Sequence, residues 1–218
     1  QNRVIKNLKK DFLIEFRNRA AINISFAFAG ITTLSVSLAC GGAALTPQIH
    51  AILFWIIIFF SGMSGLSHIF IREEEEKTAI FLTLNSDPEN IYISKLIFNT
   101  ILFLCITAIV APLYFFFMQT GPVYFVSFIL TAAAGSFAVS SISTIFGAIV
   151  SKAQARGSLF TVISFPLLIP VLWISIGLTA DSLEAGAPPE WRSILFLLAF
   201  SGVIVSVSYL TFKFIWTE

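Results

Sequence analysis

The side chains with the clearest potential for chemistry are four consecutive glutamates, Glu73, Glu74, Glu75 and Glu76, which directly follow an apolar run. A second apolar stretch comes next, too short and too closely flanked by charge to cross a membrane, and it includes Ile80, Phe81 and Leu84. Because this patch would otherwise lie bare in water, the pattern favours a docking surface for a soluble partner. A solvated acidic turn is the alternative.

Candidate metal ligands are few and scattered. The chain has two cysteines, Cys40 and Cys105, and two histidines, His50 and His68. The cysteines lack the paired spacing of a zinc site or a disulfide framework, and neither histidine has a second ligand three or four residues away. We therefore expect the cysteines to act as small apolar residues and predict no metal site.

The composition is that of an integral membrane protein. Of the 218 residues, 57% are hydrophobic and 11% are charged, whereas about a quarter of the residues in soluble domains are charged. The net charge of +1 creates no field that would attract nucleic acid. Composition thus excludes a soluble enzyme, a nucleic-acid-binding protein and a disordered chain, and predicts an all-α membrane fold.

Six apolar runs approach or exceed the roughly 20 residues that a helix needs to cross a bilayer. They cover 20–40, 51–71, 96–118, 123–150, 158–180 and 193–214. The fourth run is longer than a bilayer requires, so we expect tilt or a cytoplasmic extension. The six runs contain no Asp, Glu, Lys or Arg, except for Lys213 at the inner end of the sixth run. Ion-coupled carriers need such groups, so energy for transport must come from elsewhere.

Basic residues are distributed very unevenly among the segments between these runs. Twelve of the 13 Lys and Arg residues fall in the leader, the 72–95 segment, the 151–157 loop and the tail. The segments on the other side contain only Arg192. By the positive-inside rule both termini are predicted to be cytoplasmic.

The first nineteen residues form a separate part, because they are too charged to span. Apolar residues recur at helical spacing and alternate with lysines and arginines on the other side: Val4, Ile5, Leu8, Phe12, Leu13 and Phe16 against Lys6, Lys9, Lys10 and Arg17. This pattern predicts an amphipathic helix over 1–19 at the cytoplasmic membrane surface. A charged leader that only fixes topology is the alternative. Residues 20–218 form the six-span domain, with 72–95 as a cytoplasmic loop.

Prolines mark two further features. Ser86 or Asp87 is a plausible N-cap for a helix that begins at Pro88. In the fifth run, Pro166 and Pro170 each remove a backbone donor on one helix face, so we expect a kink whose carbonyls face protein or a cavity. A kink that only improves helix packing is the alternative.

The order of these features resembles ABC-type export permeases. Such permeases have an amphipathic leader, two spans, and an acidic stretch followed by Gly-Thr, Ser-Pro and Gly-Lys before the third span. The present chain has Lys77-Thr78, Asp87-Pro88 and Ser94-Lys95 at those places. The resemblance implies that 72–95 couples to an ATPase, through Glu73–Glu76, Thr78, Ile80, Phe81, Leu84, Asp87 and Lys95.

A narrower resemblance lies in the fifth run. The sequence Ser164-Phe-Pro-Leu-Leu-Ile-Pro-Val-Leu-Trp173 is similar to that of CcmB, the haem exporter protein B of cytochrome c maturation, and the likeness in length and span number covers essentially the whole chain. It implies a fold like a type-2 ABC exporter permease. It also points to the fifth-span residues Phe165, Pro166, Pro170 and Trp173 as sites for transport or for the kink.

The CcmB resemblance implies a membrane permease that is not itself an enzyme. No G-x-x-x-x-G-K-[ST] motif occurs in the chain, so ATP must be bound by a separate subunit. The expected partners are a CcmA-like ATPase, a CcmC-like haem-handling membrane subunit and a second copy of the chain, in a bacterial inner membrane. Haem is then a transported or partner-bound ligand. We expect no tight haem binding by this chain, because its iron-ligand candidates are scattered: His50, His68, Met63 and Met118.

Two other functions fit the same sequence. One is an ABC export permease for another amphiphile, which the fifth-run motif modestly disfavours. The other is a membrane scaffold that transports nothing and recruits a soluble partner through its acidic loop. Within the first function, the sequence leaves open whether haem passes through this chain or is released from a partner by its movement.

Overall fold

The computed structural model describes residues 2–18, 20–41, 43–66, 87–151, 156–186 and 190–217. Over these ranges the regular structure consists of seven α-helices without any strand, which confirms the all-α class. The helices are α1 (Asn2–Asn18), α2 (Ala20–Cys40), α3 (Pro47–Leu66), α6 (Pro88–Met118), α7 (Phe125–Ser151), α8 (Arg156–Leu183) and α9 (Trp191–Thr217).

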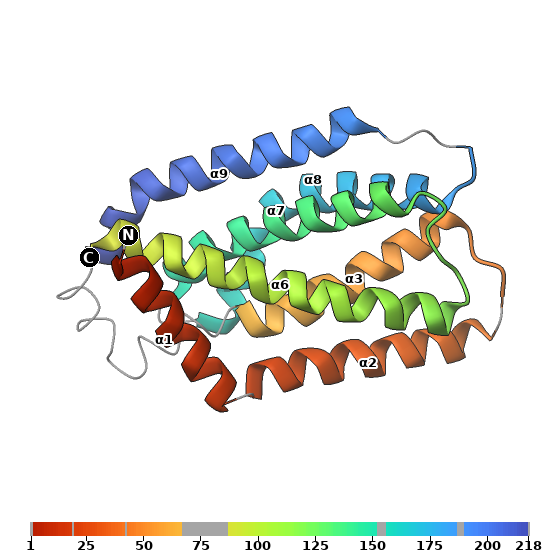
Figure 1. Ribbon diagram of the computed structural model, residues 1–218, viewed down its shortest axis with the longest axis horizontal. Coiled ribbons are helices and arrows are strands. Elements are labelled where there is room, and N and C mark those ends of the chain that lie inside the picture. The colour runs from red at the N-terminus through yellow and green to blue at the C-terminus, as the bar shows by residue number, and fades with distance from the viewer. Residues whose placement is uncertain are drawn as a thin grey trace.

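The six helices after α1 run roughly along one axis and form an elongated bundle (Figure 1). Both chain termini lie at one end of this bundle, which we call the terminal end. The connections from α2 to α3, from α6 to α7 and from α8 to α9 lie at the other end, which we call the loop end. This alternation of directions is what the six apolar runs and their intervening segments predict.

Four of the described helices have the length and apolarity needed to cross a membrane. These stretches are Pro88–Met118, Phe125–Val150, Ser164–Leu183 and Trp191–Phe214. In α2 and α3 the corresponding described stretches, Ser25–Cys40 and Pro47–Gly62, are apolar but shorter. The chain is therefore a multi-pass membrane protein with four clear candidate spans, and six spans remain a prediction.

Helix boundaries differ from the predicted runs mainly at α6. The apolar run was expected to start at residue 96, whereas α6 begins at Pro88 and extends to Met118. Hydropathy alone misses its first two turns, because they contain polar residues such as Glu89, Asn90 and Lys95. The last of these therefore lies inside the third long helix of the bundle and not on a loop before it.

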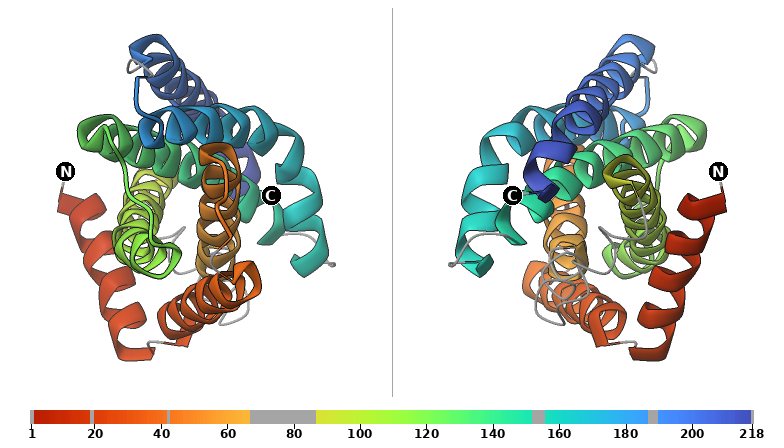
Figure 2. Two further views of the ribbon diagram at one scale, coloured as in Figure 1. Left: turned by 90° about the vertical axis from the view of Figure 1, so that its right-hand side faces the viewer. Right: turned by 90° about the vertical axis from the view of Figure 1, so that its left-hand side faces the viewer.

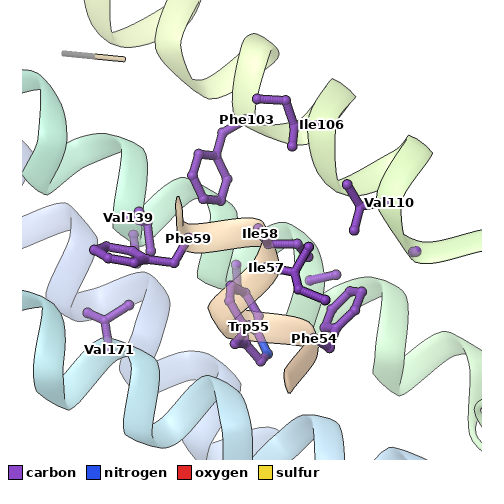
Figure 3. Close-up of a cluster of buried hydrophobic side chains, with 14 of the residues drawn as sticks. Phe54, Trp55, Ile57, Ile58, Phe59, Phe103, Ile106, Val110, Val139 and Val171 are labelled. Carbon is purple, nitrogen blue, oxygen red and sulfur yellow. The ribbon is translucent and has the colours of Figure 1, made fainter. Parts of the chain in front are cut away.

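The core of the bundle is built around α3. Its side chains Phe54, Trp55, Ile57, Ile58 and Phe59 are buried, and they lie among residues of α6, α7 and α8 (Figure 3). Aromatic rings hold the loop-end half of this core together. The ring of Phe54 lies 5.6 Å from that of Tyr114 and 5.5 Å from that of Phe128, measured between centroids.

Close contact between α3, α7 and α8 depends on one glycine. A β-carbon at Gly135 in α7 would overlap the indole ring of Trp55 and lie 2.8 Å from Ser175 Oγ of α8. The indole cannot shift freely, because its Nε1 donates a hydrogen bond of 2.8 Å to Thr179 Oγ1 of α8. Small residues at helix contacts allow membrane helices to approach each other closely in this way.

Candidate functional site

Most of the predicted ATPase-coupling residues fall outside the described part of the chain. The undescribed segment 67–86 contains Glu73, Glu74, Glu75, Glu76, Thr78, Ile80, Phe81 and Leu84. Asp87 and Lys95 are described, and both belong to the first turns of α6. The structure therefore shows how the end of the 72–95 segment connects to the bundle.

Asp87 occupies the N-cap position of α6, as predicted, with Pro88 at the first helical position. Its backbone carbonyl accepts hydrogen bonds from the amides of Asn90 and Ile91, at 3.0 and 3.2 Å. Its side chain makes no capping bond to the backbone and instead accepts a 3.0 Å hydrogen bond from Asn90 Nδ2. The described end of the 72–95 segment thus forms the N-cap and first turns of α6.

Lys95 is buried and pairs with Asp11 of the amphipathic leader. The Nζ–Oδ1 distance is 3.0 Å, and the two side chains are only 3% and 6% exposed. Lys10 Nζ lies 3.5 Å from the same carboxylate oxygen, whereas Asp11 Oδ2 is buried without a hydrogen-bond partner among the described residues. Lys95 was predicted as a coupling residue beside the membrane, and its described contact is with α1.

Aromatic packing strengthens this junction of α1 with α6. The ring of Phe12 meets that of Phe98 edge to face, with centroids 4.9 Å apart, and Leu8 also packs against the core. On another side of α1, Ile5 and Leu13 are about 60% exposed. One part of the predicted apolar face therefore binds the bundle, and the other is free to meet lipid. Figure 1 shows α1 crossing the bundle obliquely at the terminal end.

A row of polar side chains links α6 to α7 further along the bundle. Asn99 Nδ2 donates a 2.8 Å hydrogen bond to Thr144 Oγ1. The hydroxyls of Thr100 and Ser140 lie 2.9 Å apart, and those of Thr107 and Ser136 lie 3.1 Å apart. Hydrogen bonds between buried polar groups in apolar surroundings resist separation. Movement of α6 would therefore carry α7 with it.

The fifth apolar run forms α8, and its two prolines lie within one continuous helix. The first turns of α8 run at an angle to the rest, as both views along the bundle show (Figure 2). Pro166 and Pro170 each remove a backbone donor from this helix, which is a common cause of a bend.

Several side chains around these prolines lie at the surface of the described bundle. Phe165 is 49% exposed and Trp173 is 78% exposed, and Pro166 is exposed as well. Ile169 is exposed too. The four residues form one stripe on the outer surface of α8, because positions three or four residues apart lie on the same face of a helix. The other described parts of the chain leave this stripe uncovered.

The structure brings together a pair of residues that sequence reasoning left apart. His50 in the first turns of α3 is buried, and its Nδ1 lies 3.2 Å from the hydroxyl of Tyr114 in α6. His50 lines a pocket at the loop end that also includes Cys40 and Met118. The residues are far apart in the chain and have no motif spacing, so only the fold reveals the cluster. His68 lies outside the described residues, as do the side-chain atoms of Met63.

A second cavity is an apolar groove between α6 and α7, with a volume of about 500 Å³. Its walls include Ala108, Pro112, Phe115, Phe128 and Ala132, and none of the residues that line it is charged. A groove of this chemistry accommodates hydrocarbon or apolar side chains of a neighbouring helix.

Comparison with known proteins gives a family for the chain. Comparison with curated protein sequences finds no significant match. The family described as "CcmB protein" matches residues 2–214. This match spans α1, the core helices and nearly all of α9, so it covers both the leader and the membrane bundle. The chain therefore belongs to the CcmB family.

Proposed function

We propose that this chain is the permease subunit of an ABC transporter that couples ATP hydrolysis in a separate subunit to haem export or release for cytochrome c maturation. The observation that carries the proposal is the family match over residues 2–214. CcmB proteins are membrane permeases, and the family implies a haem-exporting role in cytochrome c biogenesis. The chain itself is then not an enzyme.

The proposed topology has six spans, as in type-2 ABC exporters, with both termini in the cytoplasm of a bacterium and the bundle in its inner membrane. Support comes from the sequence, in which the leader, the 72–95 segment, the 151–157 loop and the tail hold twelve of the 13 Lys and Arg residues. The loop end holds only Arg192. This asymmetry is the ordinary signal for a cytoplasmic terminal end.

The proposed coupling route begins at the 72–95 segment, which would dock on a CcmA-like ATPase. Its glutamates would pair with basic groups, and Ile80, Phe81 and Leu84 would fill a groove. Because α6 starts at Pro88 and is pinned to α1 by Lys95 and Asp11, a displacement of the segment would move both helices together. The hydrogen bonds of Asn99 and Thr107 would pass that movement to α7.

The remaining partners are also proposals. A second copy of the chain and a CcmC-like haem-handling subunit would complete the complex. The exposed stripe of α8, which includes Phe165 and Trp173, and the apolar groove between α6 and α7 are available for such contacts. Haem is the proposed cargo, and ATP is bound by the partner ATPase.

The proposal is tested by complementation of a strain that lacks this gene. Wild-type protein should restore covalent haem attachment to cytochrome c. Replacing Glu73–Glu76 by glutamine should reduce both maturation and the ATPase that co-purifies, roughly tenfold, which corresponds to a loss of about 1.4 kcal/mol in association energy.

The matched control is the Glu184→Gln/Glu190→Gln double variant, which removes exposed carboxylates at the loop end and should behave as wild type. If the strain lacking the gene matures cytochrome c normally, the cargo is another amphiphile. If the glutamine variant of Glu73–Glu76 retains full ATPase association, the assignment of this segment to coupling is wrong.

A further inference from the structure

The outward side of α1 combines positive charge with apolar surface. Within residues 4–14, whose side chains the structure describes, the exposed residues are Ile5, Lys6, Lys9 and Leu13. Ile5 and Leu13 each lie four positions from Lys9, and Lys6 lies three positions from it, so all four share one face of the helix. Two neighbouring lysines therefore lie between two apolar side chains, each of which is about 60% exposed.

The negative charge of this stretch is on the opposite side of the helix. Asp11 is the only acidic residue among residues 4–14, and it is buried against the bundle. Its carboxylate lies 3.0 Å from Lys95 Nζ, so the charge is compensated inside the protein. This stretch thus offers no carboxylate to its own exposed lysines, and its outward face keeps a net positive charge.

The contacts of α1 with α6 place it at the edge of the apolar layer. Lys95 of α6 pairs with Asp11, and the ring of Phe98 lies 4.9 Å from that of Phe12, measured between centroids. The third apolar run begins at residue 96, so both contacts lie within a turn of the point where that run begins. Headgroups occupy the layer just outside the hydrocarbon core. Figure 2 shows α1 on the outside of the bundle, beside α6.

An anionic phospholipid headgroup matches this combination of depth and chemistry. Apolar side chains of an interfacial helix enter the boundary between headgroups and acyl chains, and lysines beside them attract anionic lipid. A zwitterionic lipid would cover Ile5 and Leu13 but would give no net attraction to the lysines. An acidic soluble protein would attract the lysines, but at this depth the two apolar side chains meet lipid first.

We propose that the outward face of α1, formed by Ile5, Lys6, Lys9 and Leu13, binds anionic phospholipid headgroups of the leaflet at the terminal end. The two apolar side chains insert beside the headgroups, and the two lysines contact phosphate oxygens. Bound lipid would hold the junction of α1 with α6 at the membrane surface. The inference goes beyond the proposed function, because it rests on the membrane location of the chain and not on its cargo.

The test uses the purified full chain in a nonionic detergent, with a fluorophore attached at Ile14→Cys in a Cys40→Ala/Cys105→Ala background. Ile14 is a half-buried residue of α1, outside the proposed face. Nitroxide-labelled phosphatidylglycerol and phosphatidylcholine are titrated separately, and quenching of the fluorophore reports lipid bound at α1. Phosphatidylglycerol should reach half-maximal quenching at a concentration at least about tenfold lower. The difference should shrink at about 1 M salt, where the screening length is only about 3 Å.

Variants of the face separate its charge from its apolar surface. Lys6→Gln/Lys9→Gln should weaken quenching by phosphatidylglycerol about tenfold or more, because each lysine near an anionic surface contributes about fivefold. The same variant should leave quenching by phosphatidylcholine unchanged. Lys6→Arg/Lys9→Arg is the matched control and should keep the preference for phosphatidylglycerol. Ile5→Ala/Leu13→Ala should weaken quenching by both lipids to a similar extent.

Equal quenching by the two lipids in the wild type would overturn the proposal, as would an unchanged preference in Lys6→Gln/Lys9→Gln. Protection of the fluorophore from both lipids in the complex purified from native membranes would also overturn it and assign this face to a partner subunit. Co-purification of the ATPase is measured in parallel. An ATPase that co-purifies without any lipid preference rejects the lipid site only, whereas a lipid preference without an ATPase rejects the exporter and leaves the site.

Discussion

Lys95→Ala is expected to release α1 from the bundle and to lower the free energy of unfolding by about 3–5 kcal/mol, because it leaves a buried carboxylate unpaired. Asp11 is 6% exposed at its side chain, and one of its oxygens already lacks a hydrogen-bond partner among the described residues. Lys10, at 3.5 Å, is partly exposed and is a weaker substitute for the 3.0 Å contact with Lys95.

Thermal unfolding in detergent and limited proteolysis within residues 1–19 measure this effect. Lys95→Ala should unfold at a lower temperature and be cut faster than wild type. The double variant Asp11→Leu/Lys95→Met should recover most of the stability, because apolar residues of similar size remove the unpaired charge. Lys9→Ala is the control, because Lys9 is an exposed residue of α1, the helix that contains Asp11. Unchanged unfolding and cleavage in Lys95→Ala would show that the ion pair does not hold α1.

Gly135→Ala is the second change with a large expected effect, a loss of about 1–3 kcal/mol. The new methyl group would overlap the ring of Trp55, which is buried and anchored by its hydrogen bond to Thr179. Either α7 must move away from α3 or the indole must give up that bond. Both outcomes loosen the centre of the bundle.

Gly177→Ala in α8 is the matched control, since a β-carbon there meets nothing within 4 Å. It should leave stability unchanged or raise it by up to about 1 kcal/mol through helix propensity. In a Trp55→Leu background, Gly135→Ala should lower the free energy of unfolding by less. A double-mutant cycle measures the coupling energy between the two positions. Equal melting temperatures for the two glycine variants would contradict the proposed close contact at Gly135.

The helices were predictable from sequence because hydropathy is a local property. Runs of apolar residues located α2, α7, α8 and α9 to within a few residues, and periodicity located α1. Hydropathy alone put the start of α6 eight residues too late, because its first turns contain Glu89 and Lys95, whereas the Asp87-Pro88 pair correctly predicted a helix that begins at Pro88. The N-cap position of Asp87 was predictable because a proline follows it.

The contacts between distant residues were not predictable. Asp11 and Lys95 are 84 residues apart, and each alone is typical of a hydrated surface charge. His50 and Tyr114 are 64 residues apart and have no motif spacing. Sequence patterns also could not show that Phe165 and Trp173 lie on the outer surface of α8, because a run that is apolar on every side does not reveal which face is buried.

We propose that this member of the CcmB family works as the permease of an ATP-driven haem exporter. It is tested most directly by purification of the tagged chain from native membranes in mild detergent, followed by an ATP-hydrolysis assay and a haem absorbance spectrum. An ATPase and a haem-bearing membrane subunit should co-purify with the chain. Recovery of the chain without any ATPase would contradict the transporter function and favour a membrane scaffold.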